Sequence, residues 1–225
     1  MFTDRKEAGR KLLERLPPLD PKTTVILALP RGGLPVADVI ADALKVPLDI
    51  ALVRKVGFPG QPELAIAAVT DGDDPQITVN ADMARRAGMD DAQIRRLAER
   101  ELPEIKRRRQ VYLKGRAPIS LVGKTVVVVD DGIATGATMR AALSLVRATR
   151  PKRLIAAIPV APPDTIAEIE LDCDEVICLE SPSNFRAVGL HYGHFDQVSD
   201  ATVVDILDRH VHKRPAPSRP PLPHD

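Results

Sequence analysis

Residues 126–138 have the sequence Val-Val-Val-Val-Asp-Asp-Gly-Ile-Ala-Thr-Gly-Ala-Thr, and the order of residue types in it indicates the class of fold. Four consecutive β-branched residues predict a short strand that is buried on both faces. The small residues that follow indicate a loop, and from residue 137 to residue 149 apolar positions recur at helical spacing. A strand, a short loop and a helix in this order are typical of an α/β fold with a largely parallel sheet.

The same stretch carries groups suited to a phosphorylated sugar. Backbone N–H groups of the loop and of the helix start can surround a phosphate, and the helix dipole favours its negative charge. Thr135 and Thr138 add hydroxyl donors, and Gly136 has no Cβ to block a close approach. Asp130 and Asp131 provide hard oxygen acceptors for a sugar diol and for Mg²⁺.

The alternation of strands and helices continues on both sides of this stretch. Apolar runs predict further strands at residues 24–29, 48–54, 65–70, 76–79, 153–160 and 175–179. Helical periodicity predicts helices at residues 4–16, 34–44, 90–116, 163–170 and 200–210, with Pro103 marking a kink or break in the charged helix 90–116. We therefore expect a parallel sheet with helices on both faces and the loops at residues 30, 54, 130 and 161–163 on one rim.

The length, the net charge and the two ends of the chain give further expectations. The chain of 225 residues suffices for a single domain, expected over residues 1–212 with a charged helical insertion at about 80–116. A formal net charge of +1 gives no general reason to bind nucleic acid or a membrane surface. The polar N-terminus lacks the apolar segment of a signal peptide, so we expect a cytoplasmic protein. The Pro-rich residues 213–225 are expected to be disordered.

Residues 126–138 resemble the signature with which type I phosphoribosyltransferases bind 5-phosphoribosyl-1-pyrophosphate (PRPP). LPRGG at 29–33 is similar to the pyrophosphate loop of that family, and VRKVGFP at 53–59 to a strand end and mobile loop of its adenine and orotate enzymes. Residues 184–192 resemble the base-binding stretch of the hypoxanthine–guanine enzymes. The resemblance implies a Rossmann-like core with a small hood, and transfer of a phosphoribosyl group to a nitrogenous acceptor with Mg²⁺ and release of pyrophosphate.

The resemblance also implies a role for each segment. Asp130 and Asp131 would hold the ribose hydroxyls and, partly through those hydroxyls or water, Mg²⁺. The 5-phosphate would lie on the loop formed by Ala134, Thr135, Gly136, Ala137 and Thr138. The pyrophosphate with Mg²⁺ would lie on Arg31, Gly32 and Gly33, and would be neutralised with the help of Arg54 and Lys55. An ordinary surface turn and a solvated strand end are the alternatives for these cations.

Related enzymes have a cis peptide bond in the pyrophosphate loop, at the position that matches Pro30–Arg31. A trans loop turns successive N–H groups in alternating directions, whereas pyrophosphate needs donors that converge. We predict the same cis bond here, with Gly32 and Gly33 adopting φ/ψ values that other residues cannot reach.

The acceptor side departs from the family pattern. Ala134, Pro162 and His191 replace groups with which the family reads hypoxanthine and guanine, so we expect no efficient turnover of these bases. Phe185 and His191 are candidates for contact with the acceptor, and a core Phe and a structural His are the alternatives. Glu63, in a loop at 57–70 that is expected to close over the site, is a weak acid/base candidate, with a solvated glutamate as the alternative.

Two functions therefore stay open at this stage. The chain is an enzyme of the nucleobase-salvage type with an unidentified nitrogenous acceptor, or a regulator that senses PRPP without turning it over. Whether it forms a homodimer is also left open.

Overall fold

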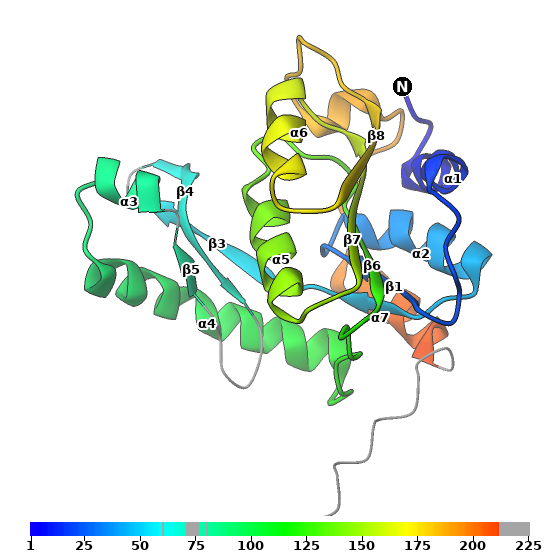
Figure 1. The fold of residues 1–225 in the computed structure, drawn as a ribbon, viewed down its shortest axis with the longest axis horizontal. Coiled ribbons are helices and arrows are strands. Elements are labelled where there is room, and N and C mark those ends of the chain that lie inside the picture. The colour runs from blue at the N-terminus through cyan, green and yellow to red at the C-terminus, as the bar shows by residue number, and fades with distance from the viewer. Residues whose placement is uncertain (60, 71–76, 80, 212–225) are drawn as a thin grey trace, which may run out of the picture.

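The computed structural model describes residues 1–59, 61–70, 77–79 and 81–211 (Figure 1). The predicted disordered segment 213–225 lies outside the described residues. In chain order the elements are α1 (Arg5–Arg15), β1 (Thr24–Ala28), α2 (Gly33–Leu44), β2 (Leu48–Ile50), β3 (Val53–Phe58), β4 (Gln61–Thr70), β5 (Ile77–Val79), α3 (Ala81–Arg86), α4 (Asp91–Leu113), β6 (Thr125–Val129), α5 (Ala137–Ala148), β7 (Arg153–Val160), α6 (Pro163–Glu170), β8 (Glu175–Glu180), the 3₁₀ turn η1 (Val188–His191) and α7 (Asp200–Arg209).

The main sheet has five parallel strands in the order β2-β1-β6-β7-β8. From β1 the chain proceeds to one edge of the sheet through α2 and β2, and from β6 it proceeds to the other edge through β7 and β8. The strand order therefore reverses between β1 and β6, whose paired ends are Ala28 and Val129. Ligands of such sheets bind beyond the carboxyl ends of the strands at this reversal.

Both faces of the main sheet are covered, as predicted for a parallel sheet. Ile26 and Val127 face an apolar layer with α1, α2 and α7. Their neighbours Leu27 and Val128 face a second layer with α5. Figure 1 shows α1 and α2 on one side of the sheet and α5 and α6 on the other. The continuous apolar runs of the strands follow from this burial on both faces.

Residues 48–54 form parts of two strands, so the prediction of a single strand there is wrong. β2 stops at Ile50, and the N–H of Ala51 makes the last bond to β1, donating to the carbonyl of Ala28 at 3.0 Å. The chain then enters a separate antiparallel sheet in the order β3-β4-β5. The predicted loop at 57–70 is also wrong, because most of these residues belong to the hairpin of β3 and β4.

The charged insertion is a short helix, α3, followed by the long helix α4. α4 begins with a capping box in which Asp90 and Gln93 exchange hydrogen bonds with each other's backbone N–H. It continues to Leu113 with Pro103 inside it, so the predicted break does not occur. α4 lies along the second sheet and reaches α7, which packs on the main sheet (Figure 1).

Candidate active site

Asp130 and Asp131 follow β6 at the strand reversal, where the sequence placed the sugar site. The N–H of Asp131 donates to Oδ1 of Asp130 at 2.9 Å. Asp131 is buried: its Oδ2 accepts from Nε of Arg5 at 2.7 Å, and its carbonyl accepts from the hydroxyl of Tyr192 at 2.5 Å. Burial and the neighbouring charge of Asp131 raise the pKa of Asp130 well above its ordinary value.

The predicted phosphate loop connects the acidic pair to α5. Ile133 N–H donates to the carbonyl of Val160 at 2.9 Å, and the hydroxyl of Thr165 donates to the carbonyl of Ala134 at 2.9 Å. These bonds fix the base of the loop, while Ala134 and Thr135 at its tip are exposed. Gly136 has φ +70° at the start of α5, and no side chain caps this helix. The first N–H groups of α5 are thus available to an anion.

The predicted pyrophosphate loop lies between β1 and α2 on the same rim. The Pro30–Arg31 peptide bond is cis, as predicted. Leu29 N–H donates to the carbonyl of Val129 at 2.9 Å, so this loop is bonded directly to the end of β6. α2 begins at Gly33 and, like α5, has no side-chain cap. Two helix starts without side-chain caps therefore flank the acidic pair, although at α2 the N–H groups of Gly33 and Leu34 donate to the carbonyls of Leu29 and Arg31.

Gly32 and Gly33 are required for close approach and not for unusual backbone angles, which corrects the prediction. Gly32 has φ −62° and ψ −36°, values that any residue can adopt. A Cβ at Gly32 would collide with the carboxylate of Asp131. A Cβ at Gly33 would lie 2.5 Å from the carbonyl oxygen of Val129 and 3.0 Å from Cα of Asp130. The absence of both side chains lets the two loops touch.

Two of the three predicted pyrophosphate cations, Arg31 and Arg54, have carboxylate partners in this structure. Nη1 of Arg31 lies 3.5 Å from Oδ1 of Asp200, at the first residue of α7. Arg54, on β3, contacts Glu101 of α4 through Nε at 2.7 Å and through Nη2 at 2.6 Å. Lys55 also lies on β3. The role of these three cations toward a pyrophosphate stays a prediction.

Phe185 and His191, the predicted acceptor contacts, lie together beyond β8. Their rings are parallel within 10°, with centroids 5.6 Å apart. Nδ1 of His191 lies 3.3 Å from Oε2 of Glu180, the last residue of β8. Glu63 is in β4, and its side chain lies outside the described part of the structure. The structure thus groups two of the three acceptor-side candidates.

Two residues of this site escaped the sequence analysis. Arg5 binds Asp131 from the first residue of α1, and Tyr192 binds it from the segment after η1. Burial raises the pKa of the Tyr192 hydroxyl above its ordinary value, so it remains a neutral donor. Arg5 belongs to no motif, and Tyr192 ends the stretch 184–192 but had no role assigned to it; the contacts with Asp131 join positions 126 residues apart for Arg5 and 61 for Tyr192. The sequence shows that Arg5 lies at the polar start of a helix, near its cap. This position does not identify the residue that Arg5 contacts.

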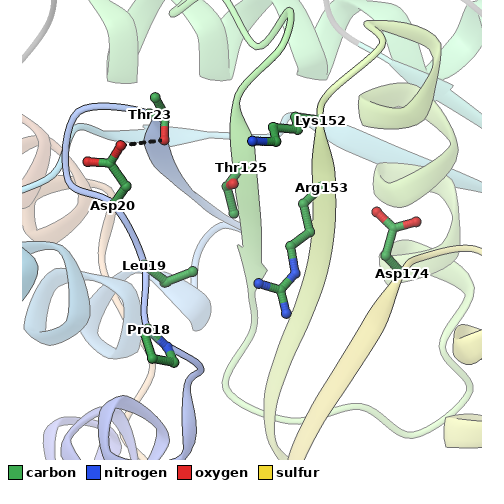
Figure 2. Close-up of a pocket in the computed structure, with 8 residues that line it drawn as sticks. All are labelled: Pro18, Leu19, Asp20, Thr23, Thr125, Lys152, Arg153 and Asp174. Atoms are coloured by element: carbon green, nitrogen blue, oxygen red, sulfur yellow. Dashed lines mark hydrogen bonds between the residues drawn. The ribbon is translucent and has the colours of Figure 1, made fainter.

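A hollow of about 550 Å³ lies at the opposite, amino-terminal edge of the main sheet (Figure 2). It is lined by Pro18, Leu19, Asp20, Thr23, Thr125, Lys152, Arg153 and Asp174. Most of its charged groups are already paired with each other or with neighbours: Asp20 with Thr23, Arg153 with Glu175 and Asp174 with Arg147. We therefore place the candidate site on the carboxyl rim, where helix starts and carboxylates converge.

Two global properties bear on the site. Within the part of the chain that the structure describes, no three His, Cys, Asp or Glu side chains converge as a metal-binding group. None of the helices in the described ranges has both the length and the hydropathy of a membrane-spanning segment.

Comparison with known proteins gives one family. The family model of the phosphoribosyl transferase domain matches residues 5–193. Two curated relatives from Mycobacterium tuberculosis strains, each named "Putative phosphoribosyl transferase", are 44% identical over 209 residues, or 93% of this chain. The chain spans about half the length of these relatives, 47%.

Two solved structures are similar in fold. TT1426 from Thermus thermophilus is 41% identical with a TM-score of 0.81, and the match covers 92% of this chain and 97% of that one. The AQ2163 protein from Aquifex aeolicus is 14% identical with a TM-score of 0.50, over 90% of this chain and 84% of that one, which shows a shared fold alone.

Proposed function

Because the chain belongs to the phosphoribosyl transferase domain family, we propose that it binds PRPP with Mg²⁺ and transfers the 5-phosphoribosyl group to a nitrogenous acceptor. The observation that supports this proposal most directly is the arrangement of groups on the carboxyl rim of the main sheet. Two helix starts without side-chain caps, those of α2 and α5, flank the carboxylates of Asp130 and Asp131 at the strand reversal. PRPP has an anionic group at each end of a sugar diol, and this rim offers complementary groups in the same order.

Each part of PRPP then has a binding group. The 5-phosphate lies on the start of α5, with Thr135 and Thr138 adding hydroxyl donors, and the pyrophosphate lies on the start of α2. The ribose hydroxyls donate to Asp130 and Asp131. The close approach of Gly33 to the end of β6 supports this reading, because it holds the α2 loop against the acidic pair.

The reaction is a displacement at C1 of the ribose. The bond from C1 to the pyrophosphate oxygen breaks, and pyrophosphate leaves with the electron pair. The lone pair of the acceptor nitrogen forms the new C1–N bond, and the proton lost from that nitrogen passes to solvent or to a base. The protein contributes orientation of the two reactants and stabilisation of the departing charge, so no protein nucleophile is needed.

Mg²⁺ fits the residues present if the substrate shares in binding it. The described residues offer no three-ligand cage, but Mg²⁺ in proteins is commonly held by one or two carboxylates together with water and substrate phosphates. Asp130 and Asp131 are the carboxylates that would hold it, with ligand hydroxyls or water completing its shell. When bound, Mg²⁺ neutralises charge on the leaving pyrophosphate.

The acceptor is proposed to be a flat nitrogenous ring of the nucleobase type, as in salvage. The parallel stack of Phe185 and His191 supports this, because a further ring can extend such a stack. Ala134, Pro162 and His191 offer none of the groups with which 6-oxopurines are read in the family, so the proposed acceptor excludes hypoxanthine and guanine. The cytoplasmic location remains a prediction from the sequence. Whether the chain forms a homodimer remains open.

A PRPP-sensing regulator is the second candidate, and one observation favours it. His191 is already engaged by Glu180 and by the ring of Phe185, so the acceptor side carries few polar groups that are committed to a substrate. A sensor would need the rim with its acidic pair and helix starts, but no acceptor site.

The experiment that tests PRPP binding is titration calorimetry with PRPP and Mg²⁺. Asp130→Asn is expected to weaken binding by about tenfold, since a ligand hydroxyl left without its acceptor costs about 1–3 kcal/mol. Asp91→Asn, at an exposed position of α4, is the matched control and should bind as the wild type does. Equal affinity in the wild type and Asp130→Asn would contradict the proposal.

Pyrophosphate release with a panel of free bases separates enzyme from sensor. An enzyme releases pyrophosphate with at least one acceptor, whereas a sensor binds PRPP and releases none. A kcat/KM for hypoxanthine or guanine of about 10⁴ M⁻¹s⁻¹ or more would show that the predicted exclusion of 6-oxopurines is wrong.

A further inference from the structure

The beginning of the described chain is fastened to the segment that follows β8. Phe2 N–H donates to the carbonyl of His191 at 2.7 Å, and Gly193 N–H donates to the carbonyl of Phe2 at 2.7 Å. His194 N–H then donates to the carbonyl of Thr3 at 2.9 Å. These bonds bring the first turn of α1 to the rim of the main sheet, beside the candidate acceptor side.

Arg5, in that first turn, makes three contacts with its guanidinium. Nε donates to Oδ2 of Asp131 at 2.7 Å, and Nη1 donates to the carbonyl of Asp196 at 2.8 Å. The guanidinium carbon lies 3.9 Å from the ring centroid of Phe195. The side chains of Arg5 and Asp131 are each 12% exposed, so the pair is largely removed from water. A planar cation held at three points has little freedom to turn.

Asp131 is thereby fixed on three sides. Arg5 holds Oδ2, the carboxylate lies against the bare Cα of Gly32, and the hydroxyl of Tyr192 holds the carbonyl. A carboxylate has about four acceptor positions, of which the bond from Arg5 uses one. Acceptor capacity therefore remains for a ligand hydroxyl, while the orientation of the carboxylate is set before the ligand arrives. Pre-orientation of this kind lowers the entropy lost on binding.

We propose that Arg5 is a positioning residue of the sugar site: it orients the carboxylate of Asp131 for a ribose hydroxyl of PRPP. The inference rests on the proposed function. It differs from a purely structural ion pair in one respect, which is selectivity among ligands. Ligands with a ribose depend on Arg5, whereas pyrophosphate alone does not, because the α2 loop is held separately by the bond from Leu29 to Val129.

The test compares three variants by titration calorimetry. Arg5→Met keeps much of the side-chain packing but removes the charge and the donors. Arg5→Lys keeps the charge but cannot hold Asp131 and Asp196 together in one planar fork. Arg10→Met, at an exposed position of the same helix, is the matched control. The probes are PRPP with Mg²⁺, and ribose 5-phosphate and pyrophosphate, each without Mg²⁺ because Asp131 would also hold the metal.

Arg5→Met is expected to lower the affinity for PRPP and for ribose 5-phosphate by about tenfold or more. The affinity for pyrophosphate should fall by less than about twofold. Arg5→Lys is expected to show the same selectivity with a smaller loss, and Arg10→Met to match the wild type. If Arg5→Met does not fold, the selective loss in Arg5→Lys carries the test.

Three results would overturn the inference. Unchanged affinities in the Arg5 variants, with a wild type that binds PRPP, would refute the role of Arg5 and leave the proposed function intact. An equal loss for all three ligands would show that the pair is structural. A wild type that binds neither PRPP nor ribose 5-phosphate would refute both proposals.

Discussion

Two adjacent glycines determine how closely the two loops of the candidate site can approach. At Gly32 a Cβ would meet a side chain, the carboxylate of Asp131, and at Gly33 it would meet the backbone of Val129 and Asp130. At Gly32 the side chain of Asp131 can give way, at the cost of its bond to Arg5, whereas at Gly33 the backbone must shift together with its strand. The same substitution should therefore have different consequences at the two positions.

Gly33→Ala is expected to lower the free energy of unfolding by about 1–3 kcal/mol, because the end of β6 must move to admit the Cβ. Gly32→Ala is expected to be the more stable variant but to lose more PRPP affinity, because it displaces Asp131 from Arg5. Urea denaturation and titration with PRPP and Mg²⁺ measure the two effects. Equal stability in the two variants would show that the contact at Gly33 yields easily.

At the scale of single residues, the sequence predicted the motif residues but not their partners. The place of Asp130 and Asp131 at a strand end and the cis Pro30–Arg31 bond could be predicted because each lies in a short segment that resembles a known signature, while the role of the two carboxylates stays a prediction. Arg5 could not, because its pairing with Asp131 depends on how the N-terminal residues attach to the segment after β8. The requirement for Gly32 was predicted, but for the wrong physical reason.

At the scale of elements, burial decided which predictions succeeded. β1, β6 and β7 lie inside a parallel sheet and were visible as uninterrupted apolar runs. The boundary between β2 and β3 was missed because the run from Leu48 to Val53, apart from Asp49, is apolar on both sides of the point where the chain changes sheets. Only the pairing partners distinguish the two strands, and a sequence does not state them.

The helix α4 contains a local conflict at Pro103. Proline has no N–H to donate to the carbonyl four residues earlier, and its ring crowds that carbonyl. The helix nevertheless continues from Asp91 to Leu113, with Ile94, Ala98 and Ile105 buried on one face. Burial of that face against the second sheet therefore outweighs the unfavourable residue.

Pro103→Ala is expected to raise the free energy of unfolding by about 1–3 kcal/mol, since the missing hydrogen bond is restored at an exposed position. Lys106→Ala, also exposed on α4, is the control and should change stability by less than about 0.5 kcal/mol. Urea denaturation measures both. A destabilised Pro103→Ala variant would mean that the helix needs the shape that proline imposes.

At the scale of the whole molecule, α4 connects the second sheet to the rim of the main sheet. Asp200, the first residue of α7, accepts from the hydroxyl of Tyr112 at 2.5 Å and from Arg107 at 3.2 Å, both on α4. Arg31 of the predicted pyrophosphate loop lies 3.5 Å from the same carboxylate. The hydrogen bond from Tyr112 lowers the pKa of Asp200, which therefore stays ionised at neutral pH. The carboxylate of Asp200, on α7, thus contacts both α4 and the predicted pyrophosphate loop of the candidate site.

Because of the hydrogen bond from Tyr112 to Asp200, we expect the free energy of unfolding to depend on pH in the alkaline range. Tyr112 is fully buried, and burial together with its hydrogen bond to Asp200 raises the pKa of its hydroxyl from 10.0 to about 12. A pKa that is higher in the folded state than in the unfolded state means that folding favours the neutral phenol. Its contribution is therefore fully present below pH 10 and is lost as the pH rises through 12. A shift of this size corresponds to about 3 kcal/mol in full, of which about 2 kcal/mol is lost between pH 10 and pH 12.

We predict that the difference in the free energy of unfolding between wild type and Tyr112→Phe is largest below pH 10. This difference should decrease by about 2 kcal/mol between pH 10 and pH 12. Below pH 10 the wild type keeps a hydrogen bond to a charged carboxylate that phenylalanine cannot make. The measurement is urea denaturation of both proteins at pH 9, 10, 11 and 12. The chain has 2 tyrosines, and Tyr192 is present in both proteins, so its titration and that of the lysines cancel in the difference. A difference that stays constant over this range would show that the phenol of Tyr112 ionises as readily in the folded chain as in the unfolded one.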